Sequence, residues 1–179
     1  PHTINPSIYA KVPYDPVKDF SPVTTIGVSP MFLFVNPSFK AQSIKEFIAQ
    51  AKAQPGKISI ASGGTGATTH LMAELLQSFA GIKLTHVPYK GGSLNVNALI
   101  AGETQANFST ISTALPHVKS GRLRALAVST AKRAAAAPDV PTLAEGGVKG
   151  YDYSSWIGLL APARTPAAII ARLNAESIK

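Results

Sequence analysis

The chain has 179 residues, of which 45% are hydrophobic, and it carries 17 Lys and Arg against 9 Asp and Glu. This length suits one large domain, or one lobe with pieces of another, and the composition is sufficient for a sizeable core. The chain has no cysteine, which excludes disulfides and thiolate metal sites, and no apolar run approaches the roughly 18 residues of a membrane-spanning helix.

The net charge of +8 raises the question of nucleic acid binding. The basic residues are spread along the chain, without a dense cluster and without interleaved aromatic residues, so we interpret them as a solvated surface and expect no nucleic acid partner. The histidines show no metal-ligand spacing (His2, His70, His86, His117), and we therefore expect neither a metal nor a cofactor.

The first part of the chain contains an extended segment followed by a helix. Tyr14–Phe34 is rich in proline and is interpreted as a crossing segment rather than as part of a compact unit. Ser43–Ala53 has apolar residues at helical spacing, begins with the capping box formed by Ser43 and Glu46, and is followed by Pro55 and Gly56. We predict a helix there.

Between residues 57 and 128 short apolar strands alternate with amphipathic helices, each helix being followed by a glycine suited to a left-handed backbone. The predicted strands are Ile58–Ala61, Leu84–Val87, Gln105–Phe108 and Ala125–Val128, and the helices are about Thr69–Ala80, Ser93–Ala101 and Thr113–Ser120. This alternation predicts an α/β fold with a mixed, mostly parallel sheet flanked by helices.

The last part of the chain contains a loop, a strand and a helix. Ala134–Gly150 is rich in Ala, Pro and Gly and is predicted to be a loop. Tyr153–Ala161 is a long apolar run and is predicted to be a strand. A final helix is expected from Thr165 as the N-cap and Pro166 in the first turn.

The loop from Ser62 to His70 connects a strand to a helix and contains three glycines, three threonines and no acid. A glycine-rich turn at a helix N-terminus exposes backbone N–H groups where the helix dipole is positive, which favours a carboxylate or phosphate. The alternative is an ordinary tight turn in which Thr68 or Thr69 only caps the helix. The loop matches neither a Walker loop, since Ala67 and Thr68 follow Gly66, nor a dinucleotide loop.

Two further loops leave predicted strand ends, Pro88–Ser93 and Ser109–Thr113, and both are rich in Gly, Ser or Thr without an acid. Ligands of α/β sheets bind at the carboxyl ends of the strands, so the three loops predict one shared site for a small anion. The ring of Tyr89 suits either a wall of that site or the core, and His70 is interpreted as a packing or capping residue.

Several segments together resemble a known family in their order and spacing: Ile4–Tyr9, Pro13–Val23, Ala61–Leu71, His86–Gly91, Ala114–Val128, Pro138–Thr142 and Trp156–Pro162. The set resembles the Bug proteins, the extracytoplasmic solute receptors of tripartite tricarboxylate transporters, from end to end of the chain. The resemblance implies a periplasmic protein of the type II periplasmic-binding-protein class, with two lobes joined by a two-stranded hinge.

The resemblance also implies how the chain is divided. Residues 1–22 are expected to be a first-lobe remnant with the first hinge crossing, residues 23–155 the ligand-binding second lobe, and residues 156–179 the return crossing with the start of a returning first-lobe segment. Chains of the family extend beyond this one at both ends and supply further ligand contacts from the first lobe.

Matching positions carry over the ligand-binding residues. Ser62, Gly64, Thr65, Gly66, Thr68 and Thr69 match the second-lobe carboxylate loop of the family, and Tyr89 and Gly91 match its neighbouring loop. At Ser109 and Thr110 the family usually has Asp, often followed by Asn. The loss of that acid is expected to make the site more favourable to plain anions and less favourable to amino acids.

The function implied by the resemblance is capture of a small organic carboxylate, a di- or tricarboxylate or related acid, for a tripartite tricarboxylate-type transporter. The expected partners are that carboxylate and the membrane components of the transporter, with no membrane insertion of the chain itself.

One alternative is a carboxylate sensor for signalling. Another is an α/β hydrolase-like enzyme using Ser62 or Ser93, but the chain has no Gly-x-Ser-x-Gly elbow and no acid placed to orient a triad. We therefore expect no enzyme activity.

Overall fold

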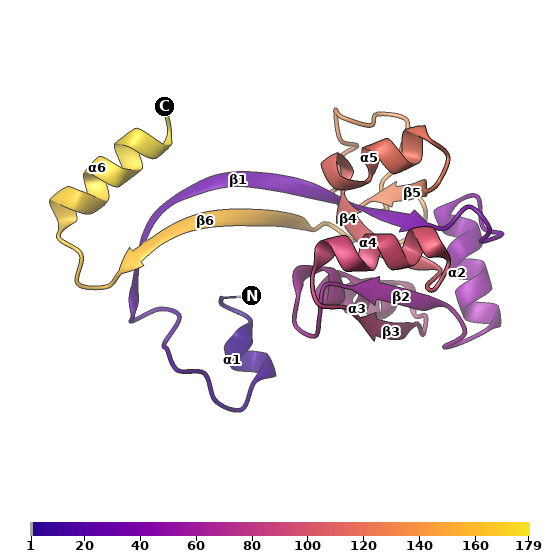
Figure 1. Ribbon diagram of the computed structural model, residues 1–179, viewed down its shortest axis with the longest axis horizontal. Coiled ribbons are helices and arrows are strands. Elements are labelled where there is room, and N and C mark those ends of the chain that lie inside the picture. Colours follow the sequence, from indigo (N-terminus) through magenta and orange to yellow (C-terminus); the bar gives the residue numbers. More distant parts are fainter. Residues whose placement is uncertain (1) are drawn as a thin grey trace. The chain divides into compact units, whose positions relative to one another are not determined.

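The computed structural model describes residues 2–179, which form two compact units (Figure 1). One unit is Pro30–Ser154, and the other is Pro1–Ser29 together with Ser155–Lys179. The two longest strands, β1 (Phe20–Val35) and β6 (Ser154–Pro162), pair with each other and run through the boundaries between the units.

A sheet forms the centre of the Pro30–Ser154 unit. Its short strands are β2 (Ser59–Ser62), β3 (Thr85–Pro88), β4 (Ala106–Thr110) and β5 (Arg124–Val128), and the order is β3-β2-β4-β1-β5. β2 pairs in parallel with β3 and β4, whereas β1 pairs antiparallel with β4 and β5. Four strands of this path therefore point one way and β1 points the other, which confirms the predicted mixed, mostly parallel sheet.

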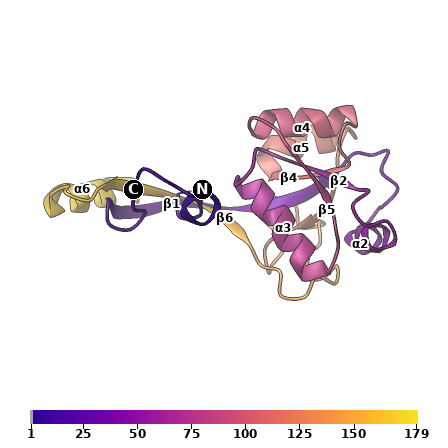
Figure 2. The ribbon, with the colours of Figure 1, turned by 90° about the horizontal axis from the view of Figure 1, so that it is seen from below.

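Helices cover both faces of this sheet. They are α2 (Ile44–Ala53), α3 (Thr68–Ala80), α4 (Gly92–Ala101) and α5 (Ile111–Lys119), and Figure 2 shows α4 and α5 on one side and α2 and α3 on the other. Two separate apolar clusters correspond to these two sides: Phe47 and Met72 belong to the cluster that contains α2 and α3, and Leu99 to the one that contains α4 and α5. The flanking helices predicted from the sequence are confirmed, with ends shifted by one or two residues.

The end of β1 belongs to the core of this unit, which differs from the expectation of a crossing segment. Met31, Leu33 and Val35 pack into the cluster of α2 and α3, while Phe32 and Phe34 pack into the cluster of α4 and α5. Successive side chains of a strand point to opposite faces, so an unbroken apolar run suits a strand that is covered on both sides. The extended conformation was predicted correctly, but the position of this strand inside the sheet, between β4 and β5, was not.

The helix ends show which capping predictions hold. The Ser43 side chain accepts a hydrogen bond from the Glu46 N–H, as predicted, and the Glu46 carboxylate accepts one from the Gln42 N–H at 2.8 Å. α3 begins at Thr68 with Ala67 as its N-cap and without a side-chain cap, so the alternative in which Thr68 or Thr69 caps this helix is wrong. At the far end of α3, Gly81 is left-handed, as predicted.

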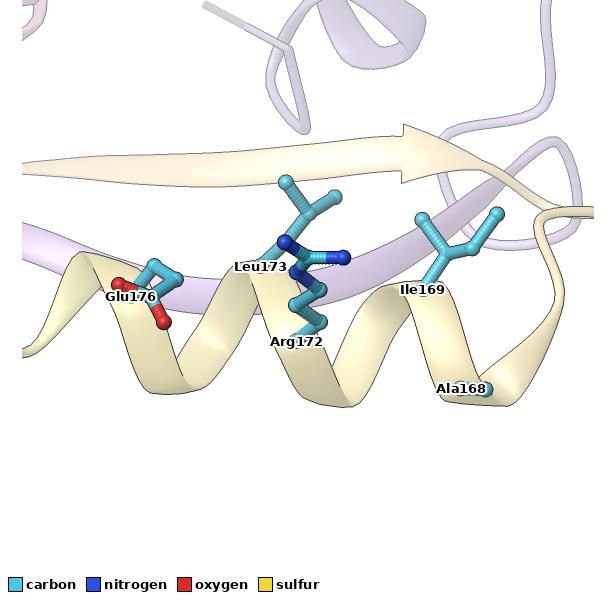
Figure 3. A pocket seen from close by; sticks show the side chains of 5 residues that line it. All are labelled: Ala168, Ile169, Arg172, Leu173 and Glu176. Atoms are coloured by element: carbon cyan, nitrogen blue, oxygen red, sulfur yellow. The ribbon is translucent and has the colours of Figure 1, made fainter.

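The other unit contains α1 (Asn5–Ile8), which was not predicted, and α6 (Ala167–Ser177). The N-cap of α6 is Pro166 rather than the expected Thr165. The Asn174 side chain donates to the Val23 carbonyl at 2.7 Å and fixes one face of α6 against β1. On another face, side chains from successive turns line a shallow hollow in Figure 3: Ala168, Ile169, Arg172, Leu173 and Glu176.

Within residues 2–179, the helices are too short and too polar for any of them to cross a lipid bilayer.

One buried polar pair lies between α4 and β4. The Asn107 Nδ2 donates to the Asn95 Oδ1 at 3.2 Å, and both residues are at most 1% exposed. The Asn95 Nδ2 and the Asn107 Oδ1 have no partner among the described residues. Each amide therefore satisfies only part of its hydrogen-bonding capacity, and each depends on the other for that part.

This pair predicts a non-additive stability effect. Asn107→Leu alone leaves the Asn95 amide buried without a partner and should lower the free energy of unfolding by about 1–3 kcal/mol. The double variant Asn95→Leu, Asn107→Leu removes both polar groups and should be more stable than the sum of the two single changes implies. Urea denaturation of the four proteins measures this coupling. Strictly additive losses would contradict it.

Candidate functional site

The loops after β2, β3 and β4 meet at one edge of the sheet. The strands are parallel to one another, so their carboxyl ends share that edge. The first two loops are in van der Waals contact: a Cβ built on Gly63 would lie 3.5 Å from the Gly91 carbonyl carbon, and one on Gly64 would lie 3.4 Å from the Tyr89 carbonyl oxygen. A Cβ at either position would make ordinary van der Waals contact with the neighbouring loop, and what requires glycine at residue 64 is its φ angle of 128°.

A cavity of about 270 Å³ lies at this edge, within the Pro30–Ser154 unit. Its lining is mostly hydroxyl and amide groups with two apolar side chains and no charged residue: Met31, Thr69, Gly92, Ser93, Asn95, Phe108, Ser109, Thr110 and Thr113. A lining of this kind offers hydrogen bonds to a small polar ligand and no negative charge to repel an anion.

Three helix N-termini converge on the cavity. Thr69 is the second residue of α3, Gly92 and Ser93 are the first two of α4, and Thr110 is the N-cap of α5. The first N–H groups of a helix have no acceptor within it and lie at the positive end of its dipole. α3 and α4 have no side-chain cap at this end, whereas the Thr110 hydroxyl accepts from the N–H of Thr113. The backbone therefore favours a negative charge in this cavity.

Three of the ten residues expected to bind ligand line the cavity: Thr69, Ser109 and Thr110. The pairing of β1 with β4 sets the position of two of them, because Phe32 is opposite Ser109 and Met31 is opposite Thr110. Ser109 is 8% exposed. Thr69 has a second contact, since its hydroxyl accepts from the Gly63 N–H at 3.0 Å.

Other expected residues of the loop are engaged inside the loop itself. The Ser62 hydroxyl is buried and lies 2.6 Å from the His86 Nε2, and it accepts from the Gly64 N–H at 3.1 Å. The Gly66 N–H donates to the His70 Nδ1 at 3.1 Å. Ser62, Gly64 and Gly66 therefore shape the loop and do not line the cavity.

The remaining expected residues also lie outside the lining. Thr65 is exposed, and the Thr68 side chain forms a hydrogen bond with Tyr153 that opposes the rise in the Tyr153 pKa caused by burial. The Tyr89 hydroxyl donates to the Glu103 carboxylate at 3.0 Å, and burial and this hydrogen bond raise its pKa. Gly91 is the N-cap of α4, next to the cavity.

Sequence reasoning did not single out Ser93, Asn95 and Thr113 as ligand-binding residues, although the cavity includes them. Ser93 and Thr113 belong to loops that were predicted to converge. The spacing of Thr110 and Thr113 was a usable signal, because residues three apart lie on one side of a helical turn. No pattern in the sequence indicated Asn95, since its place depends on how α4 packs on the sheet.

The side chains of the cavity suit binding rather than catalysis. Among the described residues no group of three or more His, Cys, Asp or Glu side chains could hold a metal ion. The pair of Ser62 and His86 has the spacing of a nucleophile and a base, but Ser62 is 0% exposed and its oxygen also accepts from Gly64. A substrate has no access to this hydroxyl.

Comparison with known proteins gives a consistent match. The family described as "Tripartite tricarboxylate transporter family receptor" matches residues 1–178. Protein BugT of Bordetella pertussis is 36% identical over 174 residues, which are 97% of this chain and 53% of BugT. The chain thus spans about half the length of the curated relatives it matches.

Solved structures agree with the fold. R. palustris Rpa4515 with adipate is 35% identical, with a TM-score of 0.88 over 94% of this chain and 56% of that one. MatC from Rhodopseudomonas palustris with bound malate is 29% identical, with a TM-score of 0.88 over 99% of this chain and 59% of that one. The α/β architecture is that of a periplasmic binding protein, as the sequence predicted, and the chain belongs to the tripartite tricarboxylate transporter family of receptors, which includes the Bug proteins.

Proposed function

We propose that this chain is part of a periplasmic solute receptor that captures a small organic carboxylate for a tripartite tricarboxylate-type transporter. The observation that carries the proposal is the convergence of three helix N-termini on a cavity without an acidic residue. Two similar structures are described with adipate and with malate, both of which are dicarboxylates. The partners proposed are therefore a small di- or tricarboxylate and the membrane components of the transporter.

In this proposal one carboxylate of the ligand lies at the three helix N-termini. The hydroxyls of Thr69, Thr110 and Thr113 lie around it together with first-turn N–H groups of α3 and α4. Hydrogen bonds to a charged group are the strong ones, and several of them hold a carboxylate without a basic side chain. A ligand held in this way is bound and not transformed, because no group in the lining acts as a general base.

Two alternatives differ in what they require. A sensor for signalling would use the same cavity but a different partner, so the cavity does not separate it from uptake. Loss of carboxylate uptake in cells without the receptor favours transport. A hydrolase would need an accessible nucleophile with a base beside it. Ser62 has His86 beside it but is buried, and Ser93 lines a cavity whose lining contains no histidine and no acid. We therefore propose a binding function without catalysis.

The hydroxyl contacts predict a loss of affinity. Thr69→Ala or Thr113→Ala removes one donor to a charged group, which is worth about 1.5–3 kcal/mol and should weaken adipate binding roughly tenfold to hundredfold. Calorimetric titration measures this. Thr130→Ala removes a hydroxyl from a loop after β5 and serves as the control. Unchanged affinity in both Thr69→Ala and Thr113→Ala would contradict the proposed carboxylate position.

Ser109 predicts a change in selectivity. Ser109→Asp places a carboxylate at the cavity wall, and like-charge repulsion should weaken the binding of adipate or malate by tenfold or more, at about 1.4 kcal/mol per tenfold. The same change should weaken aspartate less, because its amino group attracts the new charge. Ser78→Asp is the control, because it makes the same change in net charge on the exposed side of α3 and outside the cavity lining. Equal effects on malate and aspartate would show that residue 109 does not face the ligand.

A further inference from the structure

Two stacked histidines contact the loop 62–69, which ends at the cavity residue Thr69. His70 is in the first turn of α3 and His86 is in β3, with ring centroids 3.9 Å apart and ring planes 22° from parallel. Both side chains are partly buried, and neither lines the cavity. His70 was interpreted from the sequence as a packing or capping residue, and the contacts of the pair give it a more specific role.

Each ring fixes one part of the loop 62–69. The His70 Nδ1 accepts from the Gly66 N–H at 3.1 Å, and the His86 Nε2 lies 2.6 Å from the Ser62 hydroxyl. α3 has no side-chain cap at Ala67, so His70, at the third helical position, reaches back toward the loop as Glu or Gln does in a capping box. The two imidazoles therefore hold the loop before the helix, whereas the N-terminus of α3 itself has no side-chain cap.

The loop that they fix contributes directly to the cavity. The Ser62 hydroxyl accepts from the Gly64 N–H, and the Thr69 hydroxyl, which lines the cavity, accepts from the Gly63 N–H at 3.0 Å. Between these contacts the chain turns through Gly64 and Gly66, whose φ angles of 128° and 77° suit only glycine. A displacement of Ser62 or Gly66 thus changes the surroundings of Thr69.

Protonation of either ring changes these contacts. A charged imidazole carries a proton on both nitrogens, so a charged His70 has no lone pair left on Nδ1 to accept the Gly66 N–H. A charged His86 donates from Nε2 to the Ser62 oxygen, and the Ser62 proton is then directed toward the Gly64 carbonyl oxygen, 3.2 Å away. Because the rings stack at 3.9 Å, the pair takes up one proton far more readily than two.

The charged groups around the pair act in opposite directions. The Glu74 carboxylate lies 3.6 Å from the His70 Nε2 and is half exposed. β2, β3 and the loop residues 63–67 contain no Asp, Glu, Lys or Arg. Burial lowers the pKa of His86, His70 lowers it further, and Glu74 opposes both. The lowered pKa of His86 favours an uncharged ring at neutral pH, so the contact of His86 with Ser62 described above is that of the uncharged ring.

We propose that His70 and His86 are positioning residues of the carboxylate site, and that His70 holds its loop in the binding geometry only while the His70 ring is uncharged. The inference rests on the proposed function and adds its regulation by pH. A bound anion attracts protons to nearby histidines, so a purely electrostatic role would strengthen carboxylate binding on acidification. Loss of the loop contacts acts in the opposite direction, and the sign of the pH effect separates the two roles.

The first test needs no ligand. The amide resonance of Gly66 is followed by NMR in the 179-residue chain between about pH 8 and about pH 6, the range around the ordinary imidazole pKa of about 6.5. The chemical shift of the Gly66 amide should change together with the ring resonances of His70. The Gly66 N–H should also exchange faster with solvent as the pH falls. A Gly66 amide that does not respond while the rings titrate would overturn the proposal.

The second test measures adipate affinity at the two ends of this range. Adipate binding should be weaker at pH 6 than at pH 8, because a charged His70 cannot accept the Gly66 N–H. His70→Gln keeps an acceptor that does not titrate and should lose most of this response, and it should weaken binding at the higher pH less than His70→Ala does. His117→Gln, at the far end of α5, is the matched control and should keep the full response.

The outcomes are distinguishable. Stronger binding at the lower pH, or a His70→Gln variant with the full response, would overturn the positioning role. A chain that binds no carboxylate at either pH would contradict the proposed function instead, and the Gly66 titration would still decide whether the histidine pair controls the loop. Protonation of the adipate itself affects every variant equally, so it cancels in the comparison with His117→Gln.

Discussion

The burial of β1 on both faces is the constraint on which the rest of this molecule depends. Residues 32–35 are fully buried, and their side chains alternate between the two apolar clusters on opposite sides of the sheet. A strand with no solvent-exposed face has one favourable register, because a shift by one residue exchanges all its side chains between the two cores. The antiparallel pairing of β1 with β4 and β5 is thereby fixed.

That register sets the chemistry of the sheet edge. Ser109 and Thr110 end β4 opposite Phe32 and Met31, so the strand pairing sets the position of these cavity-lining residues of β4. The parallel strands then bring the N-termini of α3, α4 and α5 to the same edge, and their dipoles add there. The site is an arrangement of backbone ends with hydroxyls between them, and this explains how a cavity without a basic side chain suits a carboxylate.

The loop after β2 has a different role from the one its composition indicated. Its glycines and hydroxyls resemble an anion cradle, yet Ser62, Gly64 and Gly66 direct their hydrogen bonds within the loop and to the two histidines. His70 and His86 hold the loop by hydrogen bonds, and of the loop residues 62–69 only Thr69 lines the cavity. The residues of this loop therefore set its conformation next to the cavity more than they line the cavity.

The sequence by itself determined the α/β class, the positions of α2 to α6 and of each short strand within a few residues, the family, and the three loops that meet at the site. These properties can be seen in short segments of the chain: the spacing of apolar residues, capping residues such as Ser43, glycines at helix ends, and the set of family motifs in their order. The tertiary structure alone decided that the end of β1 lies inside the sheet, between β4 and β5. Pairing between β1 and β4 joins residues about eighty positions apart, and no local pattern encodes it. It also decided which hydroxyls line the cavity. The sequence does not tell a Ser or Thr that lines the cavity, such as Thr69, from one whose oxygen contacts a neighbouring imidazole, such as Ser62.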